Sequence, residues 1–179
     1  MASDKKPDLK NSAETPRLTE LVAAALKGEE TAKSELIRFT QTPLFKFCVL
    51  LGNSRESAED LCQDVYIKAF RNLDQLKNSE AFLGWLYQIA KNLFLDRKRT
   101  EKSTTHLIPD HKSPDSTPES ILQLRQILSQ FETEDRYLIL LIELEGQSYK
   151  EAAELISCSE DAVRSRIHRL RHELLKKLK

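Results

Sequence analysis

The 179-residue sequence has few of the residues that make turns, with four glycines and six prolines. Because a fold of many short strands needs frequent turns, this scarcity disfavours an all-β protein. Long apolar segments are also missing: the longest strongly apolar run is 138–142, far too short to cross a bilayer. The first residues contain no apolar core, so we expect neither a secretory signal peptide nor direct membrane insertion. The expected location is the cytoplasm.

Cysteine is scarce and widely spaced, with only Cys48, Cys62 and Cys158 in the chain. No two of them have the short spacing of a structural zinc site or a redox CxxC pair. We therefore expect buried free thiols in a reducing compartment. A metal or redox role is the alternative interpretation.

Motifs for catalysis are missing too. The sequence has no P-loop, no GxGxxG and no GxSxG, and its acidic segment over 53–64 has no histidine or nucleophile in register. We therefore expect no enzyme, no cofactor and no metal site. His168 and His172 are spaced for one helix face and a shared metal ion, but their arginine neighbours favour contact with DNA.

The net charge is zero, with 28 basic and 28 acidic residues, which argues against a protein that coats nucleic acid non-specifically. The charges are unevenly distributed. Lys and Arg outnumber acids by seven to one over 162–179 and by five to two over 91–102, whereas 53–64 is acidic. Two basic segments suggest two contacts with a polyanion, and the acidic one suggests a protein partner. Taken singly, a charged segment of this kind is usually only a solvated helix face.

From residue 17 onward, apolar residues recur at helical spacing, so we predict an all-α fold. Residues 101–119 interrupt this pattern with three prolines and many Ser and Thr. The expected organisation is a flexible tail over 1–16, a helical domain over 17–100, a linker over 101–119 and a smaller helical domain over 120–179. The predicted helices span about 17–26, 30–39, 43–52, a segment capped by Asn53 or Ser54, 80–99, 121–128, 136–145 and two more to the C-terminus.

The last two predicted helices have the pattern of a helix-turn-helix. Ser148 and Glu151 form a capping box for the first helix, and Ser159 can cap the second after a short turn. One face of the second helix is apolar, and the opposite face carries Asp161, Ser165, His168, Arg169 and His172, flanked by Arg164, Arg166 and Arg171. Arginine binds guanine edges and phosphates alike, so this face predicts DNA binding.

A second stripe lies on the predicted helix over 80–99, where Trp85, Gln88, Asn92, Asp96 and Arg99 share one face. Amides and arginines can read base edges, and aromatic rings can stack on unpaired bases. The stripe alone leaves the alternative equally open, that the aromatic ring is a core residue and the polar pair a surface hydrogen bond.

Together these segments resemble the sigma-70 family of bacterial RNA polymerase sigma factors. Residues 57–70 (SAEDLCQDVYIKAF) resemble region 2.2, and residues 85–99 (WLYQIAKNLFLDRKR) resemble region 2.4. Residues 145–159 (EGQSYKEAAELISCS) and 162–171 (AVRSRIHRLR) resemble region 4.2. No space is left for a region 3, which is the layout of the extracytoplasmic-function (ECF, group IV) subfamily. The resemblance implies a region 2 helical bundle and a region 4 helix-turn-helix joined by the Pro-rich linker.

The resemblance also implies partners and roles. The partners would be core RNA polymerase, through its β′ clamp helices and β flap, promoter DNA and an anti-sigma factor. The implied residues for core binding are Asp60, Leu61, Gln63, Asp64 and Phe70. Those implied for the −10 element are Trp85, Lys91, Asn92, Asp96, Arg97 and Arg99, with the loop over 74–82 holding a flipped base. Those implied for the −35 element are Arg164, Ser165, His168 and Arg169, with Tyr149, Lys150 and Glu151 near the DNA backbone.

The sequence departs from the family pattern at a few positions. Ser157 stands where many members have glycine, and Ala152-Ala153 replaces a common Ile-Ala pair. His168 occupies a variable reading position, so the −35 sequence does not follow from the resemblance. Two other interpretations compete with this one: a stand-alone helix-turn-helix regulator that binds an operator without polymerase, and a helical adaptor that binds only proteins.

Overall fold

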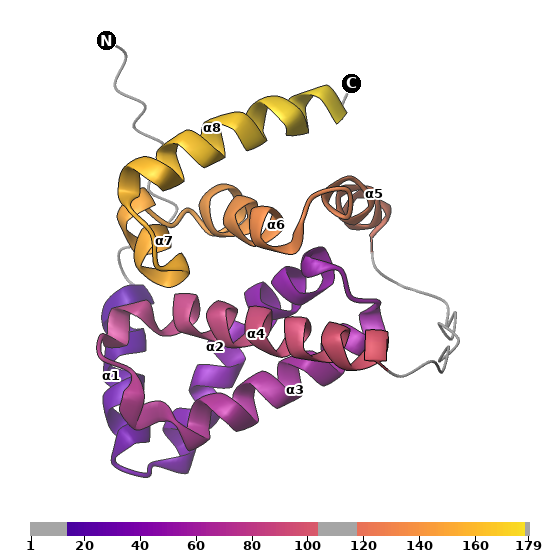
Figure 1. Cartoon of the computed structure of the whole chain (residues 1–179). Coiled ribbons are helices and arrows are strands. Elements are labelled where there is room, and N and C mark those ends of the chain that lie inside the picture. Colours follow the sequence, from indigo (N-terminus) through magenta and orange to yellow (C-terminus); the bar gives the residue numbers. More distant parts are fainter. Residues whose placement is uncertain (1–13, 104–117, 178–179) are drawn as a thin grey trace.

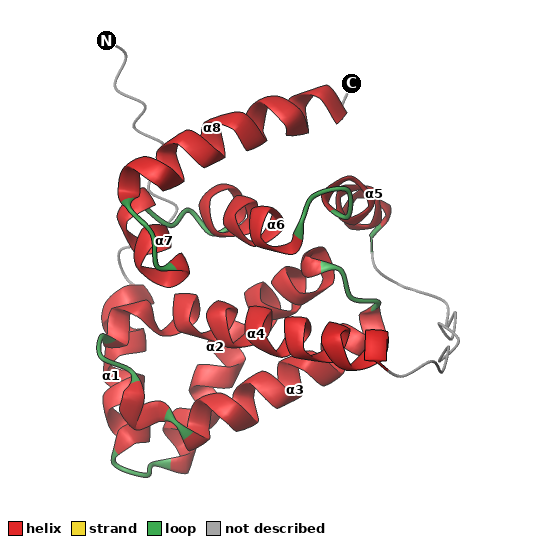
Figure 2. Cartoon of the chain, viewed as in Figure 1, coloured by secondary structure: helices red, strands yellow, loops and turns green. Residues whose placement is uncertain are grey.

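The computed structural model describes residues 14–103 and 118–177. Within these ranges every regular element is a helix, which confirms the predicted all-α fold (Figure 2). The N-terminal half contains α1 (Glu14–Leu26), α2 (Glu30–Leu51), α3 (Arg55–Arg71), the short η1 (Leu73–Gln75) and η2 (Ser79–Ala81), and α4 (Phe82–Ser103). The C-terminal half contains α5 (Glu119–Leu128), α6 (Thr133–Ile139), the π-helical turn η3 (Leu140–Leu144), α7 (Tyr149–Ile156) and α8 (Glu160–Lys177). Among the described residues, no helix is long and apolar enough to span a membrane.

The helix α2 is continuous where the sequence predicts two helices, over 30–39 and 43–52. That prediction was wrong because it took Pro43 as a break. A proline inside a helix costs about 3 kcal/mol through the lost hydrogen bond and the clash with the preceding turn. Leu36 and Leu44, on either side of it, are both fully buried, and burying one leucine stabilises by about 1.5–3 kcal/mol. Tertiary packing therefore carries the helix through the proline.

Other boundaries shift by smaller amounts. The helix α1 begins at Glu14, inside the segment expected to be a tail over 1–16, because the first turn of a helix tolerates a proline such as Pro16. The helix α4 extends to Ser103 and α5 begins at Glu119, and most of the predicted linker, 104–117, lies outside the described residues.

The two halves pack against each other around an aromatic cluster, and the C-terminal half lies along α2 and α4 (Figure 1). The rings of Phe47 on α2 and Tyr87 on α4 stack with centroids 4.3 Å apart. Tyr137 on α6 meets Phe47 edge-on at 5.9 Å. Because all three side chains are fully buried, the predicted domains share one core in this structure.

Arg136, also on α6, fixes this contact. Its side chain lies across the interface and donates to the Leu51 carbonyl at the end of α2. It also donates to the carbonyls of Leu128 at 2.9 Å and Phe131 at 3.0 Å. Gly52 makes room for it, because a Cβ there would stand 2.5 Å from Nη1, and the φ of +127° suits only glycine. A buried guanidinium with several carbonyl acceptors thus joins the halves.

The cysteines depart partly from the expectation of buried thiols. All three are free, but only Cys48 is buried, whereas Cys62 is half-buried and Cys158 is exposed. Cys158 follows the end of α7, in the turn that leads to α8. The expectation of burial therefore held best for Cys48, which lies in a helix with apolar periodicity, and failed for Cys158, which lies in a turn.

Candidate functional site

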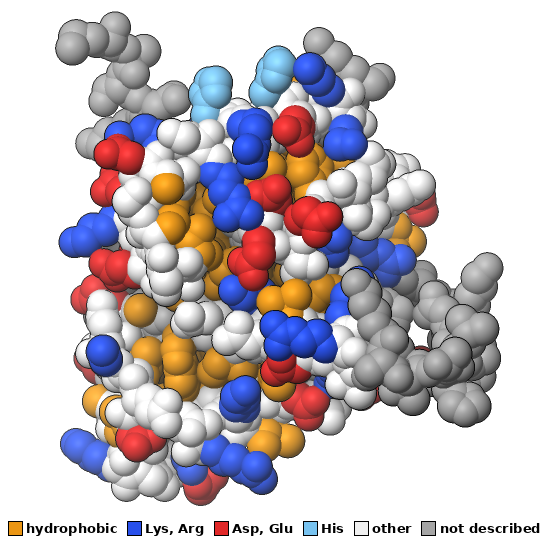
Figure 3. Space-filling model, viewed as in Figure 1, with side chains coloured by type: hydrophobic (Ala, Val, Ile, Leu, Met, Phe, Trp, Pro, Cys, Tyr) orange, Lys and Arg blue, Asp and Glu red, His pale blue; other side chains and the backbone are white. Residues whose placement is uncertain are grey.

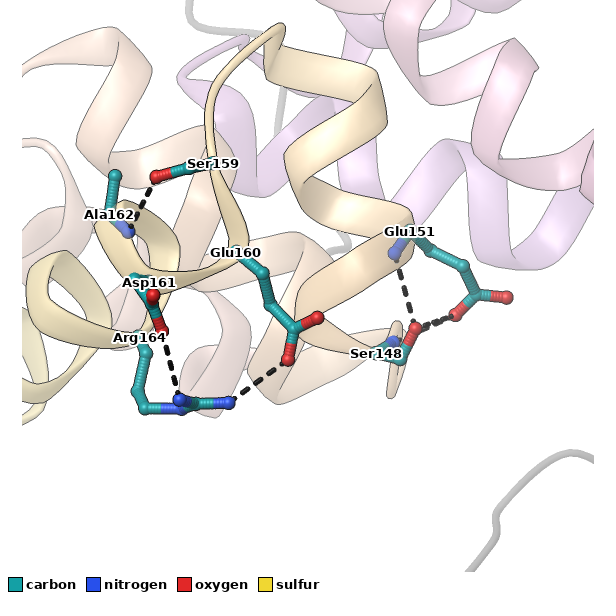
Figure 4. Close-up of polar contacts among 7 residues, drawn as sticks. All are labelled: Ser148, Glu151, Ser159, Glu160, Asp161, Ala162 and Arg164. Carbon is teal, nitrogen blue, oxygen red and sulfur yellow. Dashed lines mark hydrogen bonds and ion pairs between the residues drawn. The ribbon is translucent and has the colours of Figure 1, made fainter.

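The helix-turn-helix forms as its caps predict (Figure 4). The Ser148 hydroxyl accepts from the Glu151 N–H at 3.2 Å, and the Glu151 carboxylate accepts from the Ser148 N–H at 2.8 Å, which completes the capping box of α7. Ser159 caps α8 by accepting from the Ala162 N–H at 3.2 Å. Each cap satisfies helix N–H groups that have no acceptor within the helix. The motif is therefore set by local sequence.

Ser157 closes α7 in the left-handed conformation, with φ +55° and ψ +50°. It is the one non-glycine residue with positive φ in the described ranges. For most L-residues this conformation costs about 1–2 kcal/mol, which is why glycine is the usual choice at a helix end. Ser157 therefore carries a conformational cost at the end of α7 that a glycine would avoid.

The outer face of α8 is exposed as predicted. Ser165, His168, Arg169 and His172 all face solvent, while Val163, Ile167 and Leu170 on the opposite face are buried. Figure 3 shows histidine and basic side chains gathered along α8, at the edge of the molecule away from the N-terminal half. An exposed helix face that carries basic side chains is the kind of surface that proteins place in a DNA groove. Leu178, predicted on the apolar face, lies outside the described residues.

The arginines of α8 divide into two sets: Arg164 and Arg169 pair within the helix, the latter with Glu173 at 4.0 Å, and the other two bond to other elements. Arg164 pairs with Glu160 at 3.0 Å and Asp161 at 3.1 Å within its own helix, and it remains exposed. Such exposed pairs contribute about 0.3–0.5 kcal/mol, so DNA phosphates can displace them readily. Arg166 and Arg171 instead turn inward. Arg166 bonds Asp135 on α6 at 2.5 Å, and Arg171 bonds Glu143 on η3 at 2.8 Å, so both position α8.

The three residues predicted near the DNA backbone lie at the start of α7. Lys150 is exposed, while Tyr149 is half-buried and its hydroxyl accepts from Arg171 at 3.2 Å. The guanidinium of Arg164 lies 5.9 Å from the centroid of the Tyr149 ring. Tyr149 therefore links α7 to α8, and the Glu151 carboxylate is occupied in the capping box.

The stripe predicted on α4 is partly covered by the C-terminal half. The Gln88 amide donates to the Leu155 carbonyl of α7 at 3.3 Å. Lys91, whose side chain is only 12% exposed, pairs with Glu134 of α6 at 3.3 Å and lies 5.0 Å from the centroid of the Tyr137 ring. Trp85 is half-buried against the Phe82 ring, so it is neither a fully buried core residue nor a fully exposed ring for base stacking.

The C-terminal part of the same stripe is open. Asn92, Asp96 and Arg99 are exposed, and the last two pair at 3.2 Å on the helix surface. Arg97 instead turns to α3, where it bonds Asp64 at 2.5 Å and the Ser57 carbonyl at 3.4 Å. One arginine from the predicted −10 set thus pairs with one acid from the predicted core-binding set.

The exposed face of α3 carries most of the predicted protein-binding residues. Asp60, Gln63 and Asp64 face solvent, and Phe70 is half-buried with its ring stacked 6.1 Å from that of Tyr66. Leu61 differs, because its side chain is fully buried in the core between the helices. In this conformation Leu61 packs inside the helical core and presents no surface to solvent.

Sequence reasoning missed Ile67 on this face. It is 52% exposed and lies three and four residues after Asp64 and Gln63, so it shares their side of α3. Ile67 thus adds an exposed apolar side chain to this face, next to Asp64 and Phe70 at helical spacing. The sequence held a signal for this, because Ile67 lies off the stripe of Ala58, Leu61, Val65 and Ala69, which recurs at helical spacing and is buried.

The described residues contain no group of three or more His, Cys, Asp and Glu side chains arranged to hold a metal ion. His168 and His172 lie exposed on the outer face of α8. The site is therefore a set of three surfaces: the acidic face of α3, the partly covered stripe of α4 and the basic face of α8.

Comparison with known families assigns both halves. The model for sigma-70 region 2 matches residues 36–104, and the model for sigma-70 region 4 matches residues 121–174. The first match contains α3 and α4, and the second runs from α5 into α8.

Curated relatives agree with these matches. The chain is 32% identical over 152 residues to the ECF RNA polymerase sigma factor SigE of Mycolicibacterium smegmatis, covering 78% of this chain and 59% of the relative. It is 29% identical over 174 residues to the ECF RNA polymerase sigma factor SigW of Bacillus subtilis, covering 86% of this chain and 92% of the relative. The chain thus spans about three fifths of the first relative and nearly all of the second.

Two solved structures share the fold. CnrH in complex with the cytosolic domain of CnrY superposes with a TM-score of 0.71 at 24% identity, over 90% of this chain and 96% of that one. The sigma factor RpoE from Bartonella quintana, solved with the anti-sigma factor NepR, gives 0.65 at 24% identity, over 81% and 95%. The arrangement of helices in both halves therefore has experimental counterparts.

Proposed function

Because the chain belongs to the ECF subfamily of sigma-70 RNA polymerase sigma factors, we propose that it binds core RNA polymerase and directs it to specific promoters. The observation that carries this proposal is the order of the two matched modules, region 2 before region 4, with an exposed basic recognition helix in the second. Residues 17–100 would bind core polymerase and the −10 element, and residues 120–179 would bind the −35 element. Residues 101–119 would connect them.

The surface proposed for the β′ clamp helices is the exposed face of α3. Asp60, Gln63 and Asp64 supply acidic and amide groups, and Ile67 supplies an apolar contact among them. Phe70 extends the apolar part at the end of the helix. This combination fits a protein partner, because acids repel DNA whereas an exposed apolar side chain gains by burial. Leu61 holds the face in place from the core.

The surface proposed for the −10 element is the stripe of α4. Asn92, Asp96 and Arg99 offer an amide, a carboxylate and a guanidinium to base edges, and Trp85 offers a ring. Lys91 reaches DNA only after its pair with Glu134 opens. We therefore infer that the C-terminal half moves away from α4 when the promoter binds. The loop over 74–82 would hold a base flipped from the non-template strand. Arg97 would hold the stripe against α3 through its ion pair with Asp64.

The surface proposed for the −35 element is the outer face of α8. Arg164, Ser165, His168 and Arg169 would read base edges or adjacent phosphates, and the Arg169 side chain is 63% exposed, compared with 58% for Arg164. Tyr149 and Lys150 would lie near the backbone, with Glu151 capping the helix that carries them. Inward-facing Arg166 and Arg171 would position the helix.

We propose an anti-sigma factor as a further partner, supported by the solved relative that is bound to one. An apolar groove between the halves offers such a partner a surface. Its lining includes Leu50 on α2, Leu124 on α5, Leu144 on η3 and Leu174 on α8. The β flap of polymerase would bind the C-terminal half. No catalytic step of its own is proposed for the chain, which would act wherever the polymerase is, in the cytoplasm.

Reconstitution tests this function. The purified chain is mixed with sigma-free core RNA polymerase, transcription is run on genomic DNA fragments from the source organism, and RNA 5′ ends are sequenced. We expect discrete start sites that share two upstream elements and that disappear when the chain is omitted. Scattered starts, or no association with core while the chain alone binds an operator tightly, would refute the proposal and favour the stand-alone regulator.

Two variants assign the surfaces within this assay. Replacing both Asp60 and Asp64 by arginine should abolish association with core and leave the helix content unchanged. Replacing Ser165, His168 and Arg169 together by alanine should keep association with core and remove starts that depend on the −35 element. Identical behaviour of both variants would contradict the division of labour between α3 and α8.

A further inference from the structure

Two of the three cysteines meet in the core of the N-terminal half. The Sγ atoms of Cys48 on α2 and Cys62 on α3 lie 3.7 Å apart, in hydrogen-bond contact. Cys48 is fully buried and Cys62 is half-buried. The third, Cys158, is exposed in the C-terminal half and donates to the Ser159 carbonyl at 3.4 Å. The chain therefore holds one thiol pair and one isolated thiol.

The geometry of the pair suits a disulfide. Bonded sulfurs lie about 2.05 Å apart, so the Sγ atoms need to approach by roughly 1.7 Å. The two sulfurs already lie in contact where α2 packs on α3, so the bond would join groups that are neighbours in the folded chain. Fourteen residues separate them in the sequence, so the bond would close a short loop across the turn between the helices.

The two thiols have different chemistry. The pKa of Cys62 is lowered because the Cys48 thiol hydrogen-bonds to it, although burial and the nearby Glu59 oppose this. The pKa of Cys48 is raised by the same hydrogen bond and by burial, against an opposing effect of Arg97. Cys62 is thus the more readily ionised thiol and the one nearer to solvent, which makes it the nucleophile of the pair.

We propose that Cys48 and Cys62 form an oxidisable thiol pair, which hydrogen peroxide converts into an intramolecular disulfide between α2 and α3. The Cys62 thiolate attacks one peroxide oxygen, the O–O bond breaks, and the departing oxygen takes a proton and leaves as water. The resulting sulfenic acid is then attacked by the Cys48 sulfur, the S–O bond breaks, and the hydroxyl leaves as water with the Cys48 proton. Both sulfurs are oxidised by one electron each, and the two peroxide oxygens are reduced.

This inference does not depend on the proposed function. The disulfide would tie α2 to α3 directly behind the exposed acidic face, and a thiol reductant would restore the pair. In a reducing compartment the dithiol is the resting form, so the site would respond to peroxide only while peroxide is present.

Tryptic peptides make the test direct, because cleavage after Lys46, Arg55 and Lys68 places Cys48 in peptide 47–55 and Cys62 in peptide 56–68. Cys158 falls in peptide 151–164. The dilute full-length chain is treated with hydrogen peroxide, unfolded, alkylated and digested, and the peptides are analysed by mass spectrometry. We expect a linked species of 47–55 and 56–68, lighter than their sum by two hydrogens, with equal loss of both alkylated peptides.

Variants separate the steps of the reaction. Cys158→Ala should leave the linked species unchanged. Cys48→Ala should instead accumulate sulfenic acid on Cys62, trapped by dimedone, at several times the wild-type level. Peroxide-treated wild type in which Cys48 and Cys62 stay fully alkylatable, or in which the links join only separate chains, would overturn the proposal. The wild-type arm decides this even where a variant folds poorly.

Discussion

Replacing Arg136 by methionine should loosen the contact between the two halves. Arg136 is 6% exposed, and its guanidinium bonds the carbonyls of Leu51, Leu128, Ser129 and Phe131. Methionine keeps much of the apolar volume of the side chain but removes the guanidinium. The substitution therefore tests the polar network itself, with little change in packing.

The expected magnitude follows from the carbonyls left behind. The carbonyls of Leu51 and Leu128, at the ends of two helices, and that of the buried Phe131 would lose a charged donor, whereas that of the exposed Ser129 can bond to water. A buried acceptor left without a partner costs about 1–3 kcal/mol. Methionine also removes the cost of burying a charged guanidinium, so the net loss for the three acceptors together is about 3 kcal/mol. For a chain of this size that corresponds to a fall in Tm of roughly 6–12 °C.

Urea unfolding followed by circular dichroism measures the free energy of unfolding, and fluorescence of the single tryptophan, Trp85, reports on α4 next to the interface. Amide hydrogen exchange should also become faster at the end of α2. Arg38→Met is the matched control, because its 2.8 Å pair with Glu35 is exposed and should contribute less than about 0.5 kcal/mol. A change at Arg136 no larger than that of the control, with unchanged exchange, would refute the argument.

The remaining predictions concern single side chains. Ile67→Ala should weaken association with core polymerase by about 1–2 kcal/mol without changing chain stability, whereas Leu26→Ala, 48% exposed on α1, should change neither; equal effects on association would rule out Ile67 as a contact. Arg169→Ala should cost about 1–3 kcal/mol in holoenzyme binding to the promoter and relax the preference at one −35 base, and unchanged binding would remove it as a reader. Ser157→Gly should raise stability by about 0.5–1 kcal/mol by relieving the left-handed backbone, and a loss of stability would contradict that explanation. Burial raises the pKa of the Glu145 carboxyl above its ordinary 4.5, and the opposing effects of Tyr87 and Lys46 offset only part of the rise. The folded state therefore loses stability as the pH rises through the raised pKa. Glu145→Gln should be more stable than wild type at neutral pH, with the difference vanishing in acid, and parallel pH profiles of stability would exclude this cause.

The sequence by itself determined the features that depend on nearby residues. Helical periodicity fixed the fold class and the buried and exposed faces of α8, and the Ser148, Glu151 and Ser159 caps formed where their spacing predicted. These succeed because a capping bond or an amphipathic face requires only residues a few positions apart. The resemblance to the sigma-70 family also rested on short motifs in the sequence, and the matches to regions 2 and 4 confirm it.

Tertiary structure decided what depends on distant segments. It carried α2 through Pro43, covered Lys91 with the C-terminal half, buried Leu61 and exposed Ile67. It also brought the Cys48 and Cys62 sulfurs together and aimed Arg136 at a carbonyl 85 positions away in the sequence. Periodicity within one helix does not predict such pairs. The free energy that fixes them comes from burying side chains and satisfying polar groups between helices, and only the folded chain brings those helices into contact.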